Sequence, residues 1–139
     1  MKTNIALLIE QSVNVIDSLN KGLRLTHKEQ QFFCEHFERE EIKKNEFTIR
    51  IGDYEKYLYF IESGILRYWT AQEYGDPDKE VTFWFSFPGE FANSYFSLKE
   101  NQPSLIHIQA LTDCVIWKLS KQDLADLYQT SLNINKIAR

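Results

Sequence analysis

Cysteine is scarce in this sequence, and its scarcity excludes two kinds of small domain. The chain of 139 residues contains 2 cysteines, Cys34 and Cys114, which stand far apart. Disulfide-stapled secreted domains and zinc knuckles carry more cysteines at shorter spacings. We therefore expect neither kind of framework, and we expect both thiols to be reduced and buried.

Long apolar runs and an excess of basic residues are also lacking. No apolar stretch approaches the roughly 20 residues of a membrane helix, and residues 1–10 lack the basic start and the cleavage site of a signal peptide. We expect a cytoplasmic protein with no membrane partner. The formal net charge is -4, so the chain offers no basic face to the phosphates of nucleic acid. This segment by itself is not expected to bind DNA.

Sequence motifs of catalysis are missing as well. The chain has no nucleophile elbow, no P-loop and no dinucleotide-binding fingerprint, and we expect a protein that is not an enzyme. The acidic run at residues 38–41 alternates with Arg39 and is followed by Lys43 and Lys44. That mixture is typical of a solvated face and not of an acid-base site.

The sequence does contain enough apolar material for one well-packed domain. Hydrophobic residues make up 43% of the chain and aromatic residues 14%, which suits a single core at this length. Helical spacing over residues 5–19, with Gly22 behind it, predicts an amphipathic N-terminal helix. Thr26 and Glu29 form a capping box, which predicts a second helix that ends near Phe37.

Beyond residue 38 the pattern changes to that of short strands. Apolar alternation and apolar runs between turn residues predict strands over residues 47–51, 57–61, 65–70, 81–87, 104–110 and 115–119. The glycines of this region fall at 52, 64, 75 and 89. Such near-regular spacing of short strands is typical of a closed roll or sandwich. Residues 91–98 are expected to form a short helical turn that interrupts the sheet.

The chain is predicted to become helical again after the strands. Ser120 with Asp123 is a capping pattern, which predicts a helix over residues 121–128. Apolar residues then resume and are expected to begin a further helix, at Leu132, Ile134 and Ile137.

Three segments of the β region carry a family resemblance. They are Tyr57-Leu58-Tyr59-Phe60-Ile61-Glu62-Ser63-Gly64-Ile65-Leu66-Arg67, then Pro88-Gly89-Glu90-Phe91, then Ile108-Gln109-Ala110-Leu111 with Asp113-Cys114. In this order and spacing they resemble the cyclic-nucleotide-binding domain of the Crp/Fnr superfamily of bacterial transcription regulators. The resemblance covers roughly Gln30 to the C-terminus, and the Leu-Tyr-Phe-Ile-x-Ser-Gly run is its most telling part.

The strand pattern and the resemblance together predict a mainly β fold with flanking α-helices, a double-stranded β-helix or jelly roll of the cyclic-nucleotide-binding type. We expect one effector domain over residues 1–139, with N-terminal helices over 1–37, the β-roll over 38–119 and C-terminal helices over 120–139. The resemblance implies a homodimer through the helix begun at Leu132, Ile134 and Ile137. It also implies that DNA is bound only through a C-terminal helix-turn-helix, which is not in this chain.

The resemblance further implies a ligand pocket between Pro88 and Ala110. In the family, a Gly-Glu pair begins a short helix whose amide groups hold the cyclic phosphate, while the glutamate accepts a hydrogen bond from the ribose. Gly89 and Glu90 match that pair, and a glycine beside a helix N-terminus suits an anion on physical grounds. The alternative interpretation is a plain turn at Pro88-Gly89 with Glu90 as a favourable acid. The expected ligand-binding residues are Gly89, Glu90, Phe91, Ala92, Ser104 and Leu105.

One part of the family's binding site is missing from this sequence. The family's nucleotide binders place an arginine and a small hydroxyl residue where this chain has Ser104 and Leu105. Apart from His107, Lys99 is the only basic residue from position 89 to Ala110. A charge-assisted hydrogen bond is worth roughly 1.5 to 3 kcal/mol, so binding of cyclic AMP in the family's usual way is not expected.

The main hypothesis is therefore an effector domain that senses a small molecule, either a cyclic nucleotide or another small anionic effector, with no cofactor required. The second hypothesis is a ligand-free structural and dimerisation domain. The third is a cupin-type metal-dependent enzyme, which would need two or three histidines around one ion. His27 and His36 lie at opposite ends of a predicted helix and His107 on a distant strand, facing away from the core. The aromatic segment 81–87 is expected to be mainly core, with one side toward a pocket or a partner chain.

Overall fold

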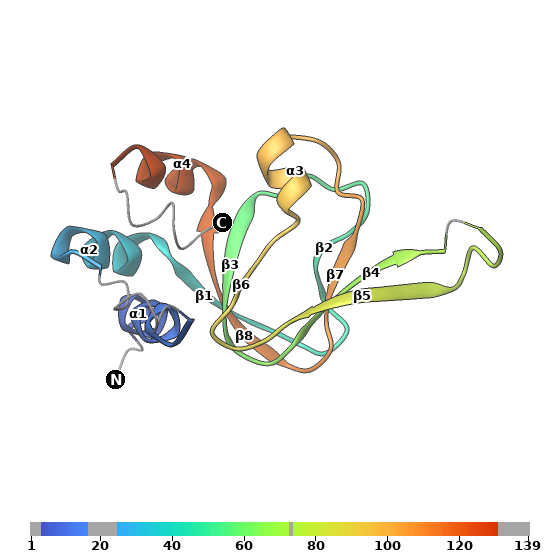
Figure 1. Cartoon of the computed structure of the whole chain (residues 1–139), viewed down its shortest axis with the longest axis horizontal. Coiled ribbons are helices and arrows are strands. Elements are labelled where there is room, and N and C mark those ends of the chain that lie inside the picture. The colour runs from blue at the N-terminus through green and yellow to red at the C-terminus, as the bar shows by residue number, and fades with distance from the viewer. Residues whose placement is uncertain (1–3, 17–24, 73, 131–139) are drawn as a thin grey trace.

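The computed structural model describes residues 4–16, 25–72 and 74–130, which form a roll of strands with helices packed at one end (Figure 1). The helices are α1 (Ile5–Ile16), α2 (His27–His36), α3 (Tyr95–Glu100) and α4 (Lys121–Thr130). The strands are β1 (Glu38–Ile42), β2 (Phe47–Ile49), β3 (Tyr57–Ser63), β4 (Leu66–Ala71), β5 (Glu80–Ser86), β6 (Phe91–Ala92), β7 (His107–Ala110) and β8 (Cys114–Ser120).

Two 4-stranded antiparallel sheets make up the roll, with strand orders β1-β8-β3-β6 and β2-β7-β4-β5. Successive side chains of a strand point to opposite faces, and the inward faces of both sheets meet in one apolar core. Its buried members are Ile42, Ile49, Tyr59, Ile61, Leu66, Tyr68, Ala92, Ile108, Ala110, Cys114 and Ile116. The predicted mainly β fold with flanking helices is confirmed.

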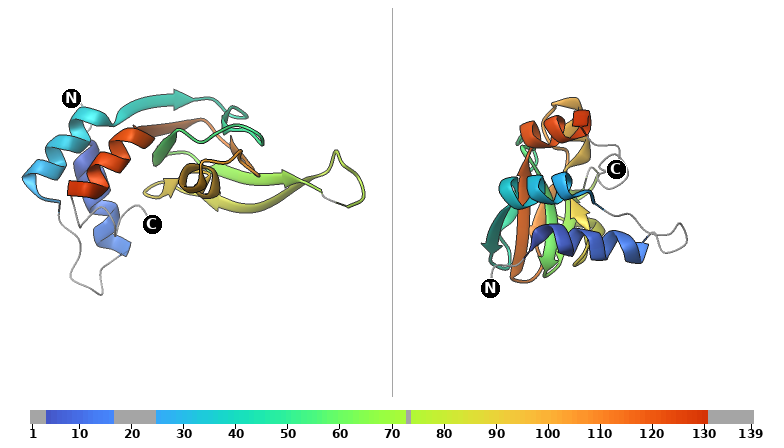
Figure 2. Two further views of the ribbon diagram at one scale, coloured as in Figure 1. Left: turned by 90° about the horizontal axis from the view of Figure 1, so that it is seen from above. Right: turned by 90° about the vertical axis from the view of Figure 1, so that its left-hand side faces the viewer.

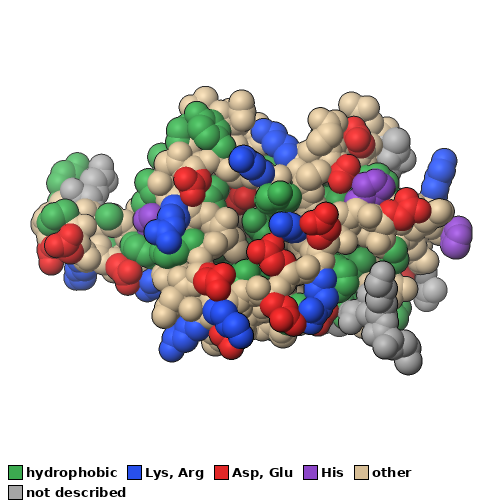
Figure 3. All heavy atoms as spheres, turned by 180° about the vertical axis from the view of Figure 1, so that it is seen from behind, with side chains coloured by type: hydrophobic (Ala, Val, Ile, Leu, Met, Phe, Trp, Pro, Cys, Tyr) green, Lys and Arg blue, Asp and Glu red, His purple; other side chains and the backbone are tan. Residues whose placement is uncertain are grey.

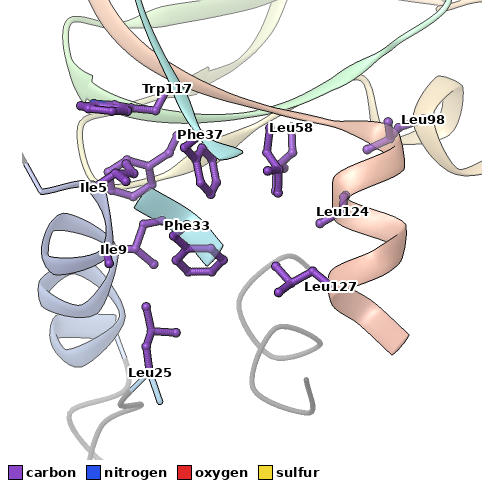
Figure 4. Packing of buried hydrophobic residues seen from close by; sticks show 13 residues of the cluster. Ile5, Ile9, Leu25, Phe33, Phe37, Leu58, Leu98, Trp117, Leu124 and Leu127 are labelled. Carbon is purple, nitrogen blue, oxygen red and sulfur yellow. The ribbon is translucent and has the colours of Figure 1, made fainter. Parts of the chain in front are cut away.

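Strand β3 is apolar on both faces because both faces are covered. Tyr59 and Ile61 face the interior of the roll, whereas Leu58 and Phe60 face the helices. Figure 2 shows α1, α2 and α4 gathered at the end of the roll that lies opposite the β4–β5 hairpin. Their apolar residues form a second core against β3 and β8, which includes Ile5, Ile9, Phe33, Phe37, Trp117, Leu124 and Leu127 (Figure 4). Full burial of one such side chain stabilises the fold by about 1.5 to 3 kcal/mol.

The predicted capping box at the start of α2 is confirmed. The Glu29 backbone N–H donates to Thr26 Oγ1 over 3.1 Å, and the Thr26 backbone N–H donates to Glu29 Oε1 over 2.7 Å. These two bonds satisfy donors that would otherwise lack a helical partner. The expected end of the first helix at residue 19, Gly22, and the further helix at Leu132, Ile134 and Ile137 lie outside the described residues.

The acidic segment 38–41 belongs to a strand that the sequence patterns missed. Strand β1 pairs with β8 from Glu38↔Lys118 to Ile42↔Cys114. Most β1 side chains are at least partly exposed, and Glu40 forms a 3.2 Å ion pair with Lys118. The strand tolerates its charges because it lies at the edge of the sheet and only Ile42 is buried.

Three predicted boundaries are wrong. Residues 91–92 form strand β6, paired with β3, so the helix expected over 91–98 begins instead at Tyr95. Strand β7 begins at His107 and not at residue 104, because the backbone of Ser104 is hydrogen-bonded to the loop at Gly52 and Asp53. Strand β2 ends at Ile49 and not at residue 51.

The two cysteines differ in exposure. Cys114 is buried in the roll as expected, whereas Cys34 is exposed, so the prediction that both thiols are buried is wrong for Cys34. The Cys34 thiol lies on the outer side of α2, where its Sγ donates to Asn4 Oδ1 over 3.4 Å.

The aromatic strand β5 is mostly exposed, which contradicts its assignment to the core. It is the outer strand of its sheet, and the β4–β5 hairpin extends beyond the roll (Figure 1). Trp84 is 61% exposed. Other exposed large side chains of this region are Val81, Phe83, Phe85 and Phe87. That one side of β5 faces a pocket or a partner chain stays a prediction.

Candidate functional site

Gly89 and Glu90 lie in a tight turn that is fastened to β3. Gly89 has a φ of 89°, a left-handed conformation that favours glycine. The Gly89 N–H donates to the Ile61 carbonyl over 2.8 Å, and the Ile61 N–H donates to the Glu90 carbonyl over 3.0 Å. The turn is therefore held as a continuation of the sheet, as the plain-turn interpretation expects.

The Glu90 carboxylate caps this same turn. Its Oε1 accepts a 2.6 Å hydrogen bond from the Phe87 N–H, and the Glu90 N–H donates to the Phe87 carbonyl over 3.1 Å. The side chain is otherwise exposed. Glu90 thus has one oxygen engaged within the protein, while a ligand can still reach its carboxylate.

The next two residues point to opposite sides of the sheet. Ala92 is buried and faces the interior of the roll beside Tyr59. Phe91 packs on the helix side, where its ring centroid lies 5.2 Å from that of Phe60. Of this predicted pair, only Ala92 faces the interior of the roll.

The chain then reaches Ser94, the residue before α3, which a buried carboxylate holds in place. The Ser94 N–H donates to Glu55 Oε2 over 2.9 Å, and both residues are buried. Helix α3 begins after Ser94, and the Ser94 side chain makes no capping bond to it. The expected placement of Gly89-Glu90 at a helix N-terminus is therefore wrong in this structure, because β6 intervenes.

Ser104 and Leu105 are neighbours in sequence that occupy different surroundings. Ser104 is buried, and its Oγ lies 2.8 Å from Ser94 Oγ and donates to the Ile106 carbonyl over 2.8 Å. Leu105 is 65% exposed. The structure therefore brings Ser104, but not Leu105, next to the segment that starts at Gly89.

Two tyrosines fill the interior of the roll next to Ala92. The Tyr68 hydroxyl accepts a 2.9 Å hydrogen bond from Ser86 Oγ, and the backbone of Asn93 also hydrogen-bonds to it. Burial raises the pKa of Tyr68, and the negative charges of Glu55 and Glu90 raise that pKa further. Burial likewise raises the pKa of Tyr59. Both hydroxyls are neutral at pH 7 and act as hydrogen-bonding groups only.

The basic side chains of the region are engaged elsewhere. Lys99 Nζ lies 5.5 Å from the ring centroid of Tyr95, an exposed residue of α3. Arg67 forms a 3.2 Å ion pair with Glu80 and a 2.9 Å hydrogen bond to Gln109. In the described part of the chain, no ion pair joins a basic side chain to Glu90.

His107 lies on the outer face of its sheet, as expected. Its ring centroid is 4.2 Å from that of Trp69, and its Nδ1 accepts a 3.1 Å hydrogen bond from the Ile51 N–H. Partial burial lowers the pKa of His107, as does the charge of Arg50. No group of three His, Cys, Asp or Glu side chains that could hold a metal ion occurs among residues 4–16, 25–72 and 74–130.

The sequence patterns missed Glu55, Tyr68 and Ser86 as parts of this region. Tyr68 lies in a predicted strand, so its burial follows from the pattern, but its contact with Ser86 depends on the register of β4 against β5. Glu55 stands in a polar stretch before β3, where an acid is normally exposed. No local signal distinguishes it from the exposed acids.

Solved structures share the fold of this chain. A crystal structure of the Thermus thermophilus catabolite activator protein superposes with a TM-score of 0.68 at 21% identity, covering 81% of this chain and 51% of that one. The c-di-GMP responsive global regulator CLP of Xanthomonas campestris gives a TM-score of 0.64 at 24% identity, covering 76% and 50%. The sensor domain of the transcriptional regulator DNR from Pseudomonas aeruginosa gives 0.72 at 11% identity, covering 96% and 85%. The chain thus spans about half the length of the first two proteins.

The two sheets and the flanking helices define a β-roll domain. The family model of the cyclic nucleotide-binding domain matches residues 39–131, and the chain belongs to that family. No curated protein sequence matches it. Within the described residues, no helix is long and apolar enough to cross a membrane.

Proposed function

We propose that this chain is the small-molecule-sensing effector domain of a Crp/Fnr-like transcription regulator, with a regulatory and not a catalytic role in the cytoplasm. The observation that carries the proposal is the family match over residues 39–131, which includes all of the β-roll except Glu38 and also the Gly89-Glu90 turn. The proposed ligand contacts remain Gly89, Glu90, Phe91, Ala92, Ser104 and Leu105, of which Glu90 presents an exposed carboxylate.

The proposed effector is not cyclic AMP bound in the family's usual way. The Gly89 and Glu90 N–H groups already donate to carbonyls of Ile61 and Phe87, so neither is open to a phosphate in this arrangement. The negative charges of Glu55 and Glu90 both raise the pKa of Tyr68. A phosphate placed beside the Tyr68 hydroxyl without a cationic partner would lose its hydration at a cost of several kcal/mol.

A ligand titration tests the proposal. Cyclic mononucleotides and a panel of metabolites are added to the protein, and binding is followed by thermal shift and calorimetry. Glu90→Ala is expected to weaken binding at least tenfold, whereas Glu46→Ala, an exposed acid on a different turn, leaves it unchanged. Flat traces for every compound would contradict the sensing role.

A ligand-free structural role is the second candidate, and the packing of the roll favours it. Tyr59, Ile61, Leu66 and Tyr68 are all buried inside the roll and belong to one apolar core. This candidate would be ruled out if Glu90→Ala abolished a ligand response while the free energy of unfolding stayed the same.

We also propose that the regulator is a homodimer formed through the helix expected at Leu132, Ile134 and Ile137, and that it contacts DNA through a helix-turn-helix outside this chain. Acidic and basic side chains are interspersed on the face shown in Figure 3, which agrees with a domain that does not itself bind DNA. The exposed aromatic side chains of β5 support burial against a partner, since exposed apolar clusters of this kind mark interaction sites.

Sedimentation velocity tests the dimer. Trp84→Gln on β5 is expected to raise the dimer dissociation constant at least tenfold, and Tyr74→Ser at the exposed hairpin tip serves as a control with no expected effect. If the protein stays monomeric while its concentration is raised 100-fold, a dimer that involves the β5 side chains is contradicted.

A further inference from the structure

Glu55 has a titratable side chain that the proposed function does not use. It lies where the loop before β3 meets α3 and the residues on either side of α3. It precedes β3 and is 4% exposed. Its Oε2 accepts from the Ser94 N–H over 2.9 Å, and its Oε1 accepts from the Lys56 and Tyr57 N–H groups over 3.2 Å and 3.4 Å. All of these hydrogen bonds are donated to the carboxyl group, which is the arrangement that an ionised carboxylate requires.

Serine hydroxyl groups also form hydrogen bonds at this junction. The Glu55 N–H donates to Ser97 Oγ of α3 over 2.8 Å. Ser94 Oγ lies 2.8 Å from Ser104 Oγ, and the Ser104 N–H donates to the Asp53 carbonyl over 2.7 Å. Residues 53–55 are thus tied to both ends of the segment that carries α3, and all three serines are buried.

The carboxylate is the charged member of this junction. The hydrogen bonds to it are donated by the backbone N–H groups of Ser94, Lys56 and Tyr57, and the side chains that α3 and its flanks bring to this junction are uncharged serines. The titratable groups that face it are Tyr59 on β3 and Tyr68 on β4, each of which experiences its negative charge. Because both tyrosines are neutral at pH 7, Glu55 is the member of this set that changes charge near neutrality.

We propose that Glu55 is a positioning residue for the candidate binding site, whose ionised carboxylate fixes Ser94 and thereby the segment from Gly89 to α3, and whose uptake of one proton from solvent releases Ser94. The proposal rests on the proposed function only where it concerns ligand binding. The neutral carboxyl group must point its new O–H at an acceptor, and the oxygens now face N–H donors. A proton taken up on Oε2 therefore removes the Ser94 bond, because the hydroxyl group formed there and the Ser94 N–H are both donors.

The pH range of this change follows from the surroundings of the group. Burial raises the pKa of Glu55 to about 7, against the opposing effect of its backbone hydrogen bonds with Ser94, Tyr57 and Lys56. The carboxylate with its Ser94 bond dominates above that pH, and the neutral group dominates below it. A shift between two arrangements requires only that the proton prefers one of them.

The decisive test uses the ligand-free full chain. The Ser94 amide and the Glu55 side-chain carboxyl carbon are followed by NMR from pH 5 to pH 9. Both are expected to titrate together with one midpoint near 7, and the Ser94 amide is expected to exchange with solvent at least tenfold faster at pH 6 than at pH 8, after correction for the intrinsic exchange rate. A Glu55 carbon that titrates below pH 5.5, or a Ser94 amide that does not follow it, overturns the proposal.

Variants separate this role from simple support of the fold. Glu55→Gln keeps the shape without the titration, so the Ser94 amide should lose its midpoint near 7, while Glu100→Gln at the exposed end of α3 should keep it. An unchanged Ser94 midpoint in Glu55→Gln also overturns the proposal. If Glu55→Gln does not fold, the titration of the Glu55 carboxyl carbon in the unmodified protein still tests the proposal.

Ligand binding provides a second, separate readout. For any compound that binds in the titration above, the dissociation constant should change at least threefold across pH 6 to 8 in the unmodified protein and stay constant in Glu55→Gln. Equal pH dependence in both proteins contradicts the coupling to binding. If nothing binds at any pH, the sensing function fails, and the Ser94 titration still tests the positioning role.

Discussion

Ser86 Oγ donates a 2.9 Å hydrogen bond to the Tyr68 hydroxyl inside the roll, and both side chains are buried. The pair links β4 to β5 at the inner face of the sheet, and the backbone of Asn93 joins the same hydroxyl. Through this contact the hairpin that carries the exposed aromatic residues is connected to Asn93, the residue after β6. A buried polar group of this kind is costly to leave unpaired.

Removal of the Tyr68 hydroxyl is therefore expected to destabilise the domain. Tyr68→Phe leaves Ser86 and the Asn93 backbone without this partner, which should lower the free energy of unfolding by about 1 to 3 kcal/mol. Urea denaturation measures the change. The double variant Tyr68→Phe with Ser86→Ala should be less destabilised than the sum of the two single variants, and strict additivity would show that the hydrogen bond contributes nothing.

Gly64 should tolerate no side chain. Its φ is 89°, and a Cβ atom there would lie 2.5 Å from the Asp113 carbonyl oxygen and 2.5 Å from Cys114 Sγ. Gly64→Ala is expected to lower the free energy of unfolding by more than about 2 kcal/mol. Gly52→Ala is the matched control, because Gly52 has a φ of 95° with nothing within 4 Å of the added atom. Gly52→Ala should lower the free energy of unfolding only by the backbone strain of about 1 to 2 kcal/mol. Equal losses of stability in the two variants would contradict a steric clash at Gly64.

Glu55 should make the stability of the domain depend on pH. Burial raises its pKa in the folded state from 4.5 to about 7, so the folded protein holds the proton more tightly than the unfolded chain. This contribution is fully present below pH 4.5 and is lost as the pH rises to 7, by on the order of 3 kcal/mol. Urea denaturation at pH 5 and pH 8 should show a fall in stability that is absent from Glu55→Gln. If Glu55 instead made the free energy of unfolding rise with pH, the raised pKa of Glu55 would be contradicted.

The two thiols should differ in reactivity. Cys34 is exposed and Cys114 is buried, and burial raises the pKa of Cys114, which keeps it protonated at pH 8. A thiol reagent such as dithionitrobenzoate should label one cysteine of the native protein rapidly and the second only on unfolding. Cys34→Ser should remove the rapid phase; loss of the slow phase instead would reverse the assignment.

Much of the fold could be predicted because it rests on local chemistry. The capping box at Thr26 and Glu29 needs only residues three apart, and it forms as predicted. The apolar run of β3 indicated burial on both faces, since a strand exposed to water on one side would alternate. The β-roll and its family followed from the order of such segments.

The candidate site could be predicted only in part, because its geometry depends on residues distant in sequence. The pattern selected Gly89 and Glu90 and predicted a helix after them, but pairing of residues 91–92 with β3 moves the helix to Tyr95. Ser104 was chosen by counting back from Ala110, and it does lie beside Ser94. Leu105 was chosen in the same way, and it points to solvent.

The sequence by itself therefore determined the family and the succession of short strands. The tertiary structure decided which backbone N–H groups are already occupied, that Trp84 is exposed and that Glu55 is buried against Ser94. The reason is physical: helix caps and strand alternation depend on neighbours along the chain, whereas burial and hydrogen bonding of a given side chain also depend on residues distant in sequence, such as Glu55 and Ser94, which are 39 positions apart.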